Sequence, residues 1–210
     1  MLSNHDVTRH VTRYGGGKRG ERRARAAALL MLALPGSAYI YQGEELGLPE
    51  VEDLPAEVRQ DPTFLRTRGE LKGRDGCRVP IPWSGDEPPY GFTAAPTAWL
   101  PQPTSWSALT AEREEGQPGS MHTLYRDALA LRRTLDLDGE ALNWVEADGD
   151  VLVFRRPPGF ACAVNFGNDV AELPASVSDA KVLLASTRAR RRGTLAANSA
   201  AWLSLGDATA

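Results

Sequence analysis

Cysteine is scarce in this sequence of 210 residues, and the few thiols present exclude two classes of protein. Only Cys77 and Cys162 occur, far apart and without a Cys-x-x-Cys pair. A disulfide-stabilised scaffold or a zinc site needs several cysteines or histidines at close, regular spacing. Both thiols are therefore predicted to be reduced and structural, with a disulfide between them left open. Neither a metal nor any other cofactor is predicted.

Long apolar runs are also missing. The longest, residues 26–34, is much shorter than the roughly 20 residues that cross a bilayer. The N-terminus lacks the basic, apolar and small-residue regions of a secretory signal, so a cytoplasmic location is predicted.

An excess of basic residues is absent too. The formal net charge is -3, which argues against general affinity for nucleic acid or anionic membrane. The arginine-rich run at residues 188–192 is accordingly predicted to be a solvated loop rather than a binding patch. With 42% hydrophobic and 24% charged residues, the chain has the composition of an ordinary folded domain, and no protein partner is predicted.

The first nine residues contain the leading candidate for chemistry. A short apolar lead ends there in Asn4, His5 and Asp6. Side chains at the carboxyl end of a barrel strand point into the mouth where catalysis takes place, and a carboxylate beside an imidazole can stabilise developing positive charge. The three residues equally fit a helix cap or a turn, because Asn and Asp bond readily to nearby backbone.

The elements that follow have the order strand, helix, strand. Residues 20–33 are rich in helix-forming Glu, Arg, Ala and Leu and stop at Pro35-Gly36, which predicts a helix. Residues 37–41 are aromatic and β-branched, and predict a buried strand that ends at polar residues 42–45. A right-handed crossover between parallel strands brings Asp6 and residues 42–45 to the same end of a sheet.

Residues 46–119 show little periodicity and contain most of the 15 prolines, which predicts a long loop. Within this loop, Arg74 and Arg78 can fork onto sugar hydroxyls or onto a carboxylate of a pocket, although both fit ordinary surface positions as well. Four aromatic side chains of the loop either pack in a core, which is favoured, or stack on sugar rings. They are Trp83, Tyr90, Trp99 and Trp106.

The last part of the chain changes period. Ser120 is placed to cap an amphipathic helix that runs to Leu135. Beyond it, short segments of alternating pattern predict a separate all-β unit. The predicted strands are 142–145, 151–155, 160–166, 181–185 and 200–205.

Several blocks are similar to those of a known family, in the same order along the chain. They are Leu2-Ser3-Asn4-His5-Asp6 with Arg9, the run from Pro35 to Gly47, the run from Gly73 to Trp83, Trp99-Leu100-Pro101, Leu131-Arg132-Arg133, and Val164-Asn165-Phe166. Together they resemble the C-terminal part of glycoside hydrolase family 13, the α-amylase family, in its α-glucosidase and oligo-1,6-glucosidase branch. The sequence departs from the family pattern at Val79 and Ile81, where Thr and Met are commoner.

This resemblance implies an α/β fold in two parts. Residues 1–137 are expected to form the last two strands and helices of a (β/α)8 TIM barrel, with the long loop at 46–119. Residues 138–210 are expected to form a small, antiparallel, β-sandwich-like domain. Because a complete barrel takes about 250 residues, the chain is expected to be the C-terminal portion of a longer enzyme.

The resemblance also implies roles for individual side chains. Asp6 corresponds to the family's third carboxylate, which stabilises the transition state, and His5 to a residue that donates to a neighbouring sugar hydroxyl. Arg74 is the expected arginine that closes the glucose pocket, with Arg78 as the alternative. Glu44 and Glu45 are expected to shape the rim.

The expected activity is retaining hydrolysis of α-glucosidic bonds in small oligosaccharides, with an α-glucoside or oligosaccharide as the binding partner. The family's nucleophile and general acid are expected upstream of this chain, so the isolated chain is expected to be inactive. A transglucosylase or disaccharide isomerase of the same family is the near alternative, and a non-enzymatic carbohydrate-binding remnant is the alternative from another class.

Overall fold

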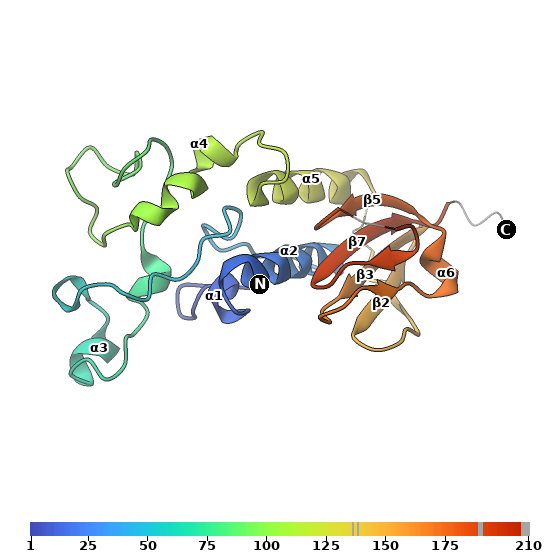
Figure 1. Cartoon of the computed structure of the whole chain (residues 1–210), viewed down its shortest axis with the longest axis horizontal. Coiled ribbons are helices and arrows are strands. Elements are labelled where there is room, and N and C mark those ends of the chain that lie inside the picture. Colours follow the sequence, from blue (N-terminus) through green and yellow to red (C-terminus); the bar gives the residue numbers. More distant parts are fainter. Residues whose placement is uncertain (136, 138, 189–190, 207–210) are drawn as a thin grey trace. The chain divides into compact units, whose positions relative to one another are not determined.

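The structure is a computed structural model that describes residues 1–135, 137, 139–188 and 191–206 (Figure 1). The chain divides into two compact units, which we call the first unit, Met1–Gly17 with Tyr39–Thr123, and the second unit, Lys18–Ala38 with Leu124–Ala210. The domain boundary expected after residue 137 involves Asp138, and the arginine-rich run includes Arg190, both of which lie outside the described residues. The division at that point stays a prediction.

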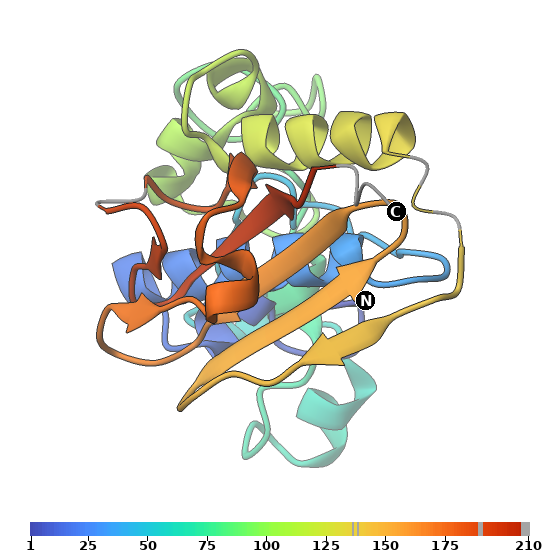
Figure 2. The same cartoon turned by 90° about the vertical axis from the view of Figure 1, so that its right-hand side faces the viewer.

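The second unit is built on one antiparallel sheet with the strand order β1-β2-β3-β7-β5 (Figure 2). All five predicted strands are confirmed, each within about two residues. A second, two-stranded sheet of β4 and β6 and the short helix α6 were not predicted. The elements are β1 Asn143–Val145, β2 Val151–Arg156, β3 Phe160–Asn165, β4 Ala171–Glu172, α6 Ala175–Ser178, β5 Lys181–Ala185, β6 Thr194–Leu195 and β7 Ser199–Ser204.

The five-stranded sheet is covered on both faces. Helices α2 (Gly17–Ala33) and α5 (Met121–Thr134) lie on one side of it, and α6 lies on the other (Figures 1 and 2). Strand β3 is buried along its whole length, because alternate residues face either the helices or a cluster that includes Val177 of α6. On the helix side, the Trp202 indole packs edge-on against Phe160 and donates to the Leu29 carbonyl at 3.0 Å.

Both predicted long helices are therefore confirmed. The C-terminal end of α2 is capped by side chains from later parts of the second unit. The last carbonyls of a helix have no partner within the helix. The guanidinium of Arg132 donates to the carbonyl oxygen of Leu32 in the last turn of α2. It also donates to the carbonyls of Leu34 at 3.1 Å and Gly36 at 2.7 Å, just beyond the helix. Buried Arg156 donates to the carbonyl of Ala33 at 3.0 Å. These cations also complement the negative end of the helix dipole.

The two barrel strands expected at residues 2–6 and 37–41 are not formed, and this prediction is wrong for the described structure. The first strand along the described chain is β1, at Asn143. Tyr39, expected to be buried, is 68% exposed. A strand forms only where neighbouring backbone takes up its N–H and C=O groups, and no described segment pairs with either stretch. The described residues accordingly contain no closed barrel.

Residues 46–119 form the long connection that was predicted, interrupted by short helical turns. A compact core lies beneath it, and the preference for core packing is confirmed for Tyr90 and Trp106, each 1% exposed. It is wrong for Trp83 and Trp99, which are about half exposed. The helices of the first unit are α1 His10–Arg13, η1 Ala56–Val58, α3 Pro62–Arg66, η2 Asp75–Arg78, η3 Thr104–Leu109 and α4 Ala111–Glu114, where η denotes a 3-10 helix.

Both cysteines are free and buried. Burial raises the pKa of the Cys77 thiol to about 11 and also raises the pKa of Cys162, so both are held as thiols at neutral pH. Among the described residues, none of the helices has both the length and the apolar character needed to cross a membrane.

Candidate active site

Asp6 lies between two arginines in the first unit. Arg74 directly precedes helix η2, Arg78 is its last residue, and both reach the same carboxylate oxygen. Arg74 Nη1 donates to Asp6 Oδ1 at 2.8 Å, and Arg78 Nη2 donates to it at 3.2 Å. The hydrogen bond from Arg74 is the main reason why the pKa of Asp6 lies below its ordinary value. Because its pKa is lowered, Asp6 is ionised at neutral pH. Its side chain is 47% exposed and therefore accessible to a ligand.

His5 belongs to the same group of side chains. Its Nε2 lies 3.2 Å from Asp6 Oδ2, and its backbone carbonyl accepts from Arg78 Nε at 2.8 Å. Asn4 faces the backbone, since its Oδ1 accepts from the N–H of Asp6 at 2.8 Å. The turn that was considered for this stretch is therefore present, and it presents His5 and Asp6 side by side.

Arg74 also contacts a carboxylate that the sequence did not single out. Its Nε donates to Asp61 Oδ2 at 2.5 Å, so the guanidinium bridges Asp61 and Asp6. The Arg74 hydrogen bond holds the pKa of Asp61 far below its ordinary value. The only sequence signal was an Asp directly before Pro62, which is typical of a helix cap and does not indicate its tertiary partner.

Glu44 and Glu45, the expected rim residues, bond to nearby backbone. Glu44 is 1% exposed, and its Oε1 accepts from the N–H of Ser3 at 2.6 Å. Glu45 Oε2 accepts from the N–H of Gly43 at 2.9 Å. Glu44 thereby ties the start of the chain to the loop at 42–50, whereas Glu45 stabilises the turn of that loop.

A buried arginine joins the same two segments. The guanidinium of Arg9 lies 5.2 Å from the ring centroid of Tyr41 and donates to the Gln42 carbonyl at 2.8 Å. The N–H of Arg9 donates to Glu50 at 2.9 Å. Burial lowers the pKa of Arg9 and raises that of Glu50. The segment that carries His5 and Asp6 is therefore fixed to the loop at 42–50 by several independent contacts.

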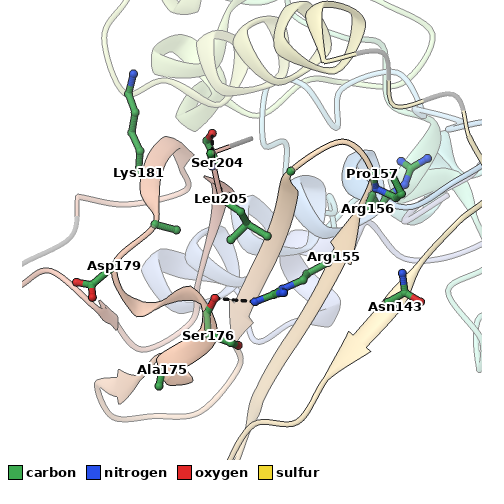
Figure 3. Close-up of a pocket in the computed structure, with 13 residues that line it drawn as sticks. Asn143, Arg155, Arg156, Pro157, Ala175, Ser176, Asp179, Lys181, Ser204 and Leu205 are labelled. Carbon is green, nitrogen blue, oxygen red and sulfur yellow. Dashed lines mark hydrogen bonds between the residues drawn. The ribbon is translucent and has the colours of Figure 1, made fainter. Parts of the chain in front are cut away.

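The second unit contains a surface cavity of about 740 Å³ that includes none of the candidate residues (Figure 3). Its lining includes the start of β1, the end of β2, the start of β5, the end of β7 and part of α6. Across it, Arg155 donates to the carbonyl of Ser176 at 2.7 Å, while Lys181 and Asp179 lie at its margin. Within the described part of the chain, no group of three or more His, Cys, Asp or Glu side chains is arranged to hold a metal ion.

Comparison with known families identifies the class of protein. Residues 1–137 match the family model described as the catalytic domain of alpha amylase. This match covers more than half of the chain, so the chain belongs to the α-amylase family, glycoside hydrolase family 13. The resemblance inferred from the sequence blocks is confirmed.

The relatives define the branch of the family. "Probable alpha-glucosidase" of Rhizobium meliloti (strain 1021) is 40% identical over 180 residues, which are 82% of this chain and 32% of that protein. "Oligo-1,6-glucosidase" of Parageobacillus thermoglucosidasius is 31% identical over 154 residues, which are 65% of this chain and 27% of that protein. The chain thus spans about a third of the length of these curated relatives.

Solved structures share the fold. The alpha-glucosyl transfer enzyme XgtA is 34% identical, with a TM-score of 0.79 over 96% of this chain and 39% of that chain. A variant of the trehalulose synthase MutB is 25% identical, with a TM-score of 0.78 over 97% of this chain and 42% of that chain.

Proposed function

We propose that this chain supplies part of the active site of an enzyme that hydrolyses α-glucosidic bonds in small oligosaccharides with retention of configuration. One observation carries the proposal: an ionised, accessible Asp6 is held beside His5 and between Arg74 and Arg78. The names of the relatives, which include an α-glucosidase and an oligo-1,6-glucosidase, support the same substrate class.

The charges of this group suit the reaction. Glycoside hydrolysis passes through an oxocarbenium-like transition state in which positive charge develops on the sugar ring. An Asp6 carboxylate stabilises that charge because the hydrogen bond from Arg74 keeps it ionised. His5 can donate to a sugar hydroxyl, and Arg74 closes the glucose pocket beside it. The nucleophile and the general acid are assigned to parts of the enzyme outside these 210 residues.

Transfer of a glucosyl group is the second candidate, and a specific similarity favours it. XgtA, at 34% identity, is an alpha-glucosyl transfer enzyme, and MutB, at 25% identity, is a trehalulose synthase. Hydrolysis and transfer differ in whether water or a sugar hydroxyl attacks in the second step, and Asp6 has the same role in both. A cytoplasmic location and the lack of nucleic-acid, membrane and protein partners stay predictions.

A chimera provides an assayable enzyme. In it, this chain replaces the matching third of the Rhizobium meliloti relative, whose own sequence supplies the rest. We expect the chimera to release the chromophore of a chromogenic α-glucoside. Analysis of the sugars formed from maltose separates the two candidates. Hydrolysis gives glucose alone, whereas transfer gives a longer sugar, with glucose as the leaving group, or a rearranged disaccharide. A folded chimera without either activity would contradict the proposal.

The role of Asp6 is tested in that chimera. Asp6→Asn should lower kcat by at least about a hundredfold while KM changes little, because the carboxylate acts mainly on charge that appears in the transition state. If KM rises and kcat is preserved, Asp6 holds the substrate and takes no part in catalysis. The 210-residue chain by itself is expected to show no turnover above that of an Asp6→Ala control.

A further inference from the structure

Asp61 is a buried carboxylate located directly behind Arg74. It is 1% exposed, and its Oδ2 accepts from both the Nε and the backbone N–H of Arg74, at 2.5 and 3.0 Å. The opposite edge of the same guanidinium points at Asp6. Arg74 therefore contacts one carboxylate that is fixed inside the first unit and another at the surface.

Several contacts fix Asp61 itself. It caps helix α3, since its Oδ1 accepts from the N–H of Thr63 at 2.7 Å. Its own N–H donates to buried Asp75 at 3.0 Å. Gly73 packs against it so closely that an added Cβ would lie 2.7 Å from the Cβ of Asp61, and its φ of +72° also favours glycine. The carboxylate of Asp61 is thus held before Arg74 binds to it.

We propose that Asp61 is the positioning residue of Arg74: it anchors the Nε edge of the guanidinium so that the Nη1 edge faces Asp6 and the glucose pocket. The part that concerns the pocket rests on the function proposed above, whereas the anchoring itself does not. The side chains of Arg74 and Asp6 are 39% and 47% exposed, and an ion pair between two such groups holds neither partner firmly. The buried contact to Asp61 fixes the plane of the guanidinium before substrate arrives, which is the condition for effective orientation.

The substitution Asp61→Asn separates anchoring from helix capping. The amide oxygen of Asn can still accept from Thr63 and preserve the cap of α3. Its amide nitrogen then faces the two N–H donors of Arg74, where the carboxylate offered an acceptor. The variant should therefore keep the loop and release Arg74.

The first measurement uses the whole 210-residue chain and the 15N relaxation of arginine Nε–H groups. In the unchanged chain, the Nε–H group of Arg74 should be rigid, with an order parameter of about 0.8. In Asp61→Asn, this order parameter should fall below about 0.6. Arg59 is the internal reference for the fold of the same loop, because it is buried and its Nε donates to the Leu54 carbonyl at 3.0 Å. Exposed Arg126 is the mobile reference.

The outcomes are distinct. A mobile Arg74 with a rigid Arg59 supports the proposal, and an Arg74 that stays rigid in Asp61→Asn overturns it. If both arginines become mobile, the loop has unfolded in Asp61→Asn. The order parameter of Arg74 in Asp6→Asn then decides which carboxylate anchors the guanidinium. Because Asp6 is at the surface, its substitution leaves the loop intact. Arg74 should then stay rigid on Asp61, and a loss of order would show that Asp6 is the anchor.

The second measurement uses the chimera and extends the test to catalysis. Asp61→Asn should lower kcat/KM by about ten- to a hundredfold, the usual effect of a displaced orienting group. The matched control is Thr110→Ala, which removes the cap of α4 in the same unit and should leave kcat/KM unchanged. Unchanged kcat/KM in Asp61→Asn overturns the catalytic part of the proposal. An inactive parent chimera, in contrast, argues against the proposed function and leaves the relaxation result to judge the anchoring.

Discussion

The two units of this chain are stabilised by different kinds of contact. The second unit is organised around an antiparallel sheet of five strands, in which only the pairing of β5 with β7 shifts register, between Val182 and Leu184. Apolar side chains cover both faces of this sheet. The first unit has no strand among its described residues. It has an apolar core that includes Tyr90 and Trp106, and its loops are held by buried ionic and polar side chains that bond to backbone, such as Arg9, Glu44 and Asp61. In the second unit, backbone hydrogen bonds between strands fix the course of the chain. In the first unit, individual side chains fix the loops, so substitution of a single side chain is expected to have a local effect.

The largest expected effect is the loss of apolar packing in the second unit. Trp202→Ala should destabilise that unit by about 3–5 kcal/mol, because Trp202 is fully buried and packs edge-on against Phe160. Trp144→Ala is the matched control on the same sheet: Trp144 is 63% exposed, and its removal should cost about 1 kcal/mol or less. Urea titrations that follow the methyl NMR signals of Val153 give both values. If both substitutions lower the free energy of unfolding equally, apolar packing on the helix-facing side of the sheet does not stabilise the second unit.

The next effect concerns pH and the first unit. His10 is 1% exposed, and burial lowers its pKa from 6.5 to about 4. The unfolded chain therefore binds a proton at His10 between those two values while the folded chain does not. The stability of the first unit should be greatest above about pH 6.5 and should fall by roughly 3 kcal/mol as the pH decreases to about 4.

Urea titrations between pH 4 and 7 measure this dependence, with the indole signal of Trp106 as the reporter of the first unit. The free energy of unfolding of the unchanged chain is compared with that of His10→Asn at each pH. Glu50, whose pKa is also shifted by burial, contributes equally to both, so the difference isolates the contribution of His10. If the two pH dependences coincide, His10 is accessible to protons in the folded state, and the comparison between the two units loses one of its supports.

The smallest effect compares two glycines with positive φ, one in each unit. An added Cβ at Gly43 would lie 2.7 Å from both Arg9 Nη1 and Leu48 Cδ1, whereas the same atom at Gly149 meets nothing within 4 Å. Gly43→Ala should therefore cost about 2–3 kcal/mol and Gly149→Ala about 1 kcal/mol, which is the backbone strain alone. The same urea titrations measure both losses. If Gly43→Ala and Gly149→Ala cost the same free energy of unfolding, Arg9 has room to move and does not fix the loop at 42–50.

Much of the fold could be predicted from local patterns. Residues 20–33 and 121–134 have helical composition or spacing, and the five strands are short segments separated by Gly, Pro, Asn and Asp. These properties are local, and the elements form as predicted. The alternation expected for all five strands is absent from β3, which is buried along its whole length. The strand expected at 37–41 has an equally good local pattern, but it pairs with no segment that the structure describes. A strand depends on hydrogen bonds to distant segments, so its pattern alone could not decide whether it forms.

The candidate site was predictable to a similar degree. His5, Asp6, Arg74 and Arg78 came from the sequence, and the structure brings these four together. Asp61 and the contacts of Arg9 were not predicted as parts of the site. Each depends on a tertiary contact between segments that are 13 to 41 positions apart. Arg9 belongs to a block that resembles the family, but that block does not indicate its partners, and Asp61 belongs to no block. Their roles follow from geometry alone.

Helix α2 has a consequence for the order in which the protein is made. The groups that complete this helix come from much later positions: the donor to Ala33 is 123 residues further on, and the donor to Leu29 is 173 residues further on. At about 5–20 residues per second, Arg156 is synthesised roughly 6–25 s after Ala33. Throughout that interval, Leu29 and Leu32, both fully buried in the folded chain, lack the sheet that packs against this helix. Helix α2 is therefore completed only after strand β7, which carries Trp202, has been synthesised.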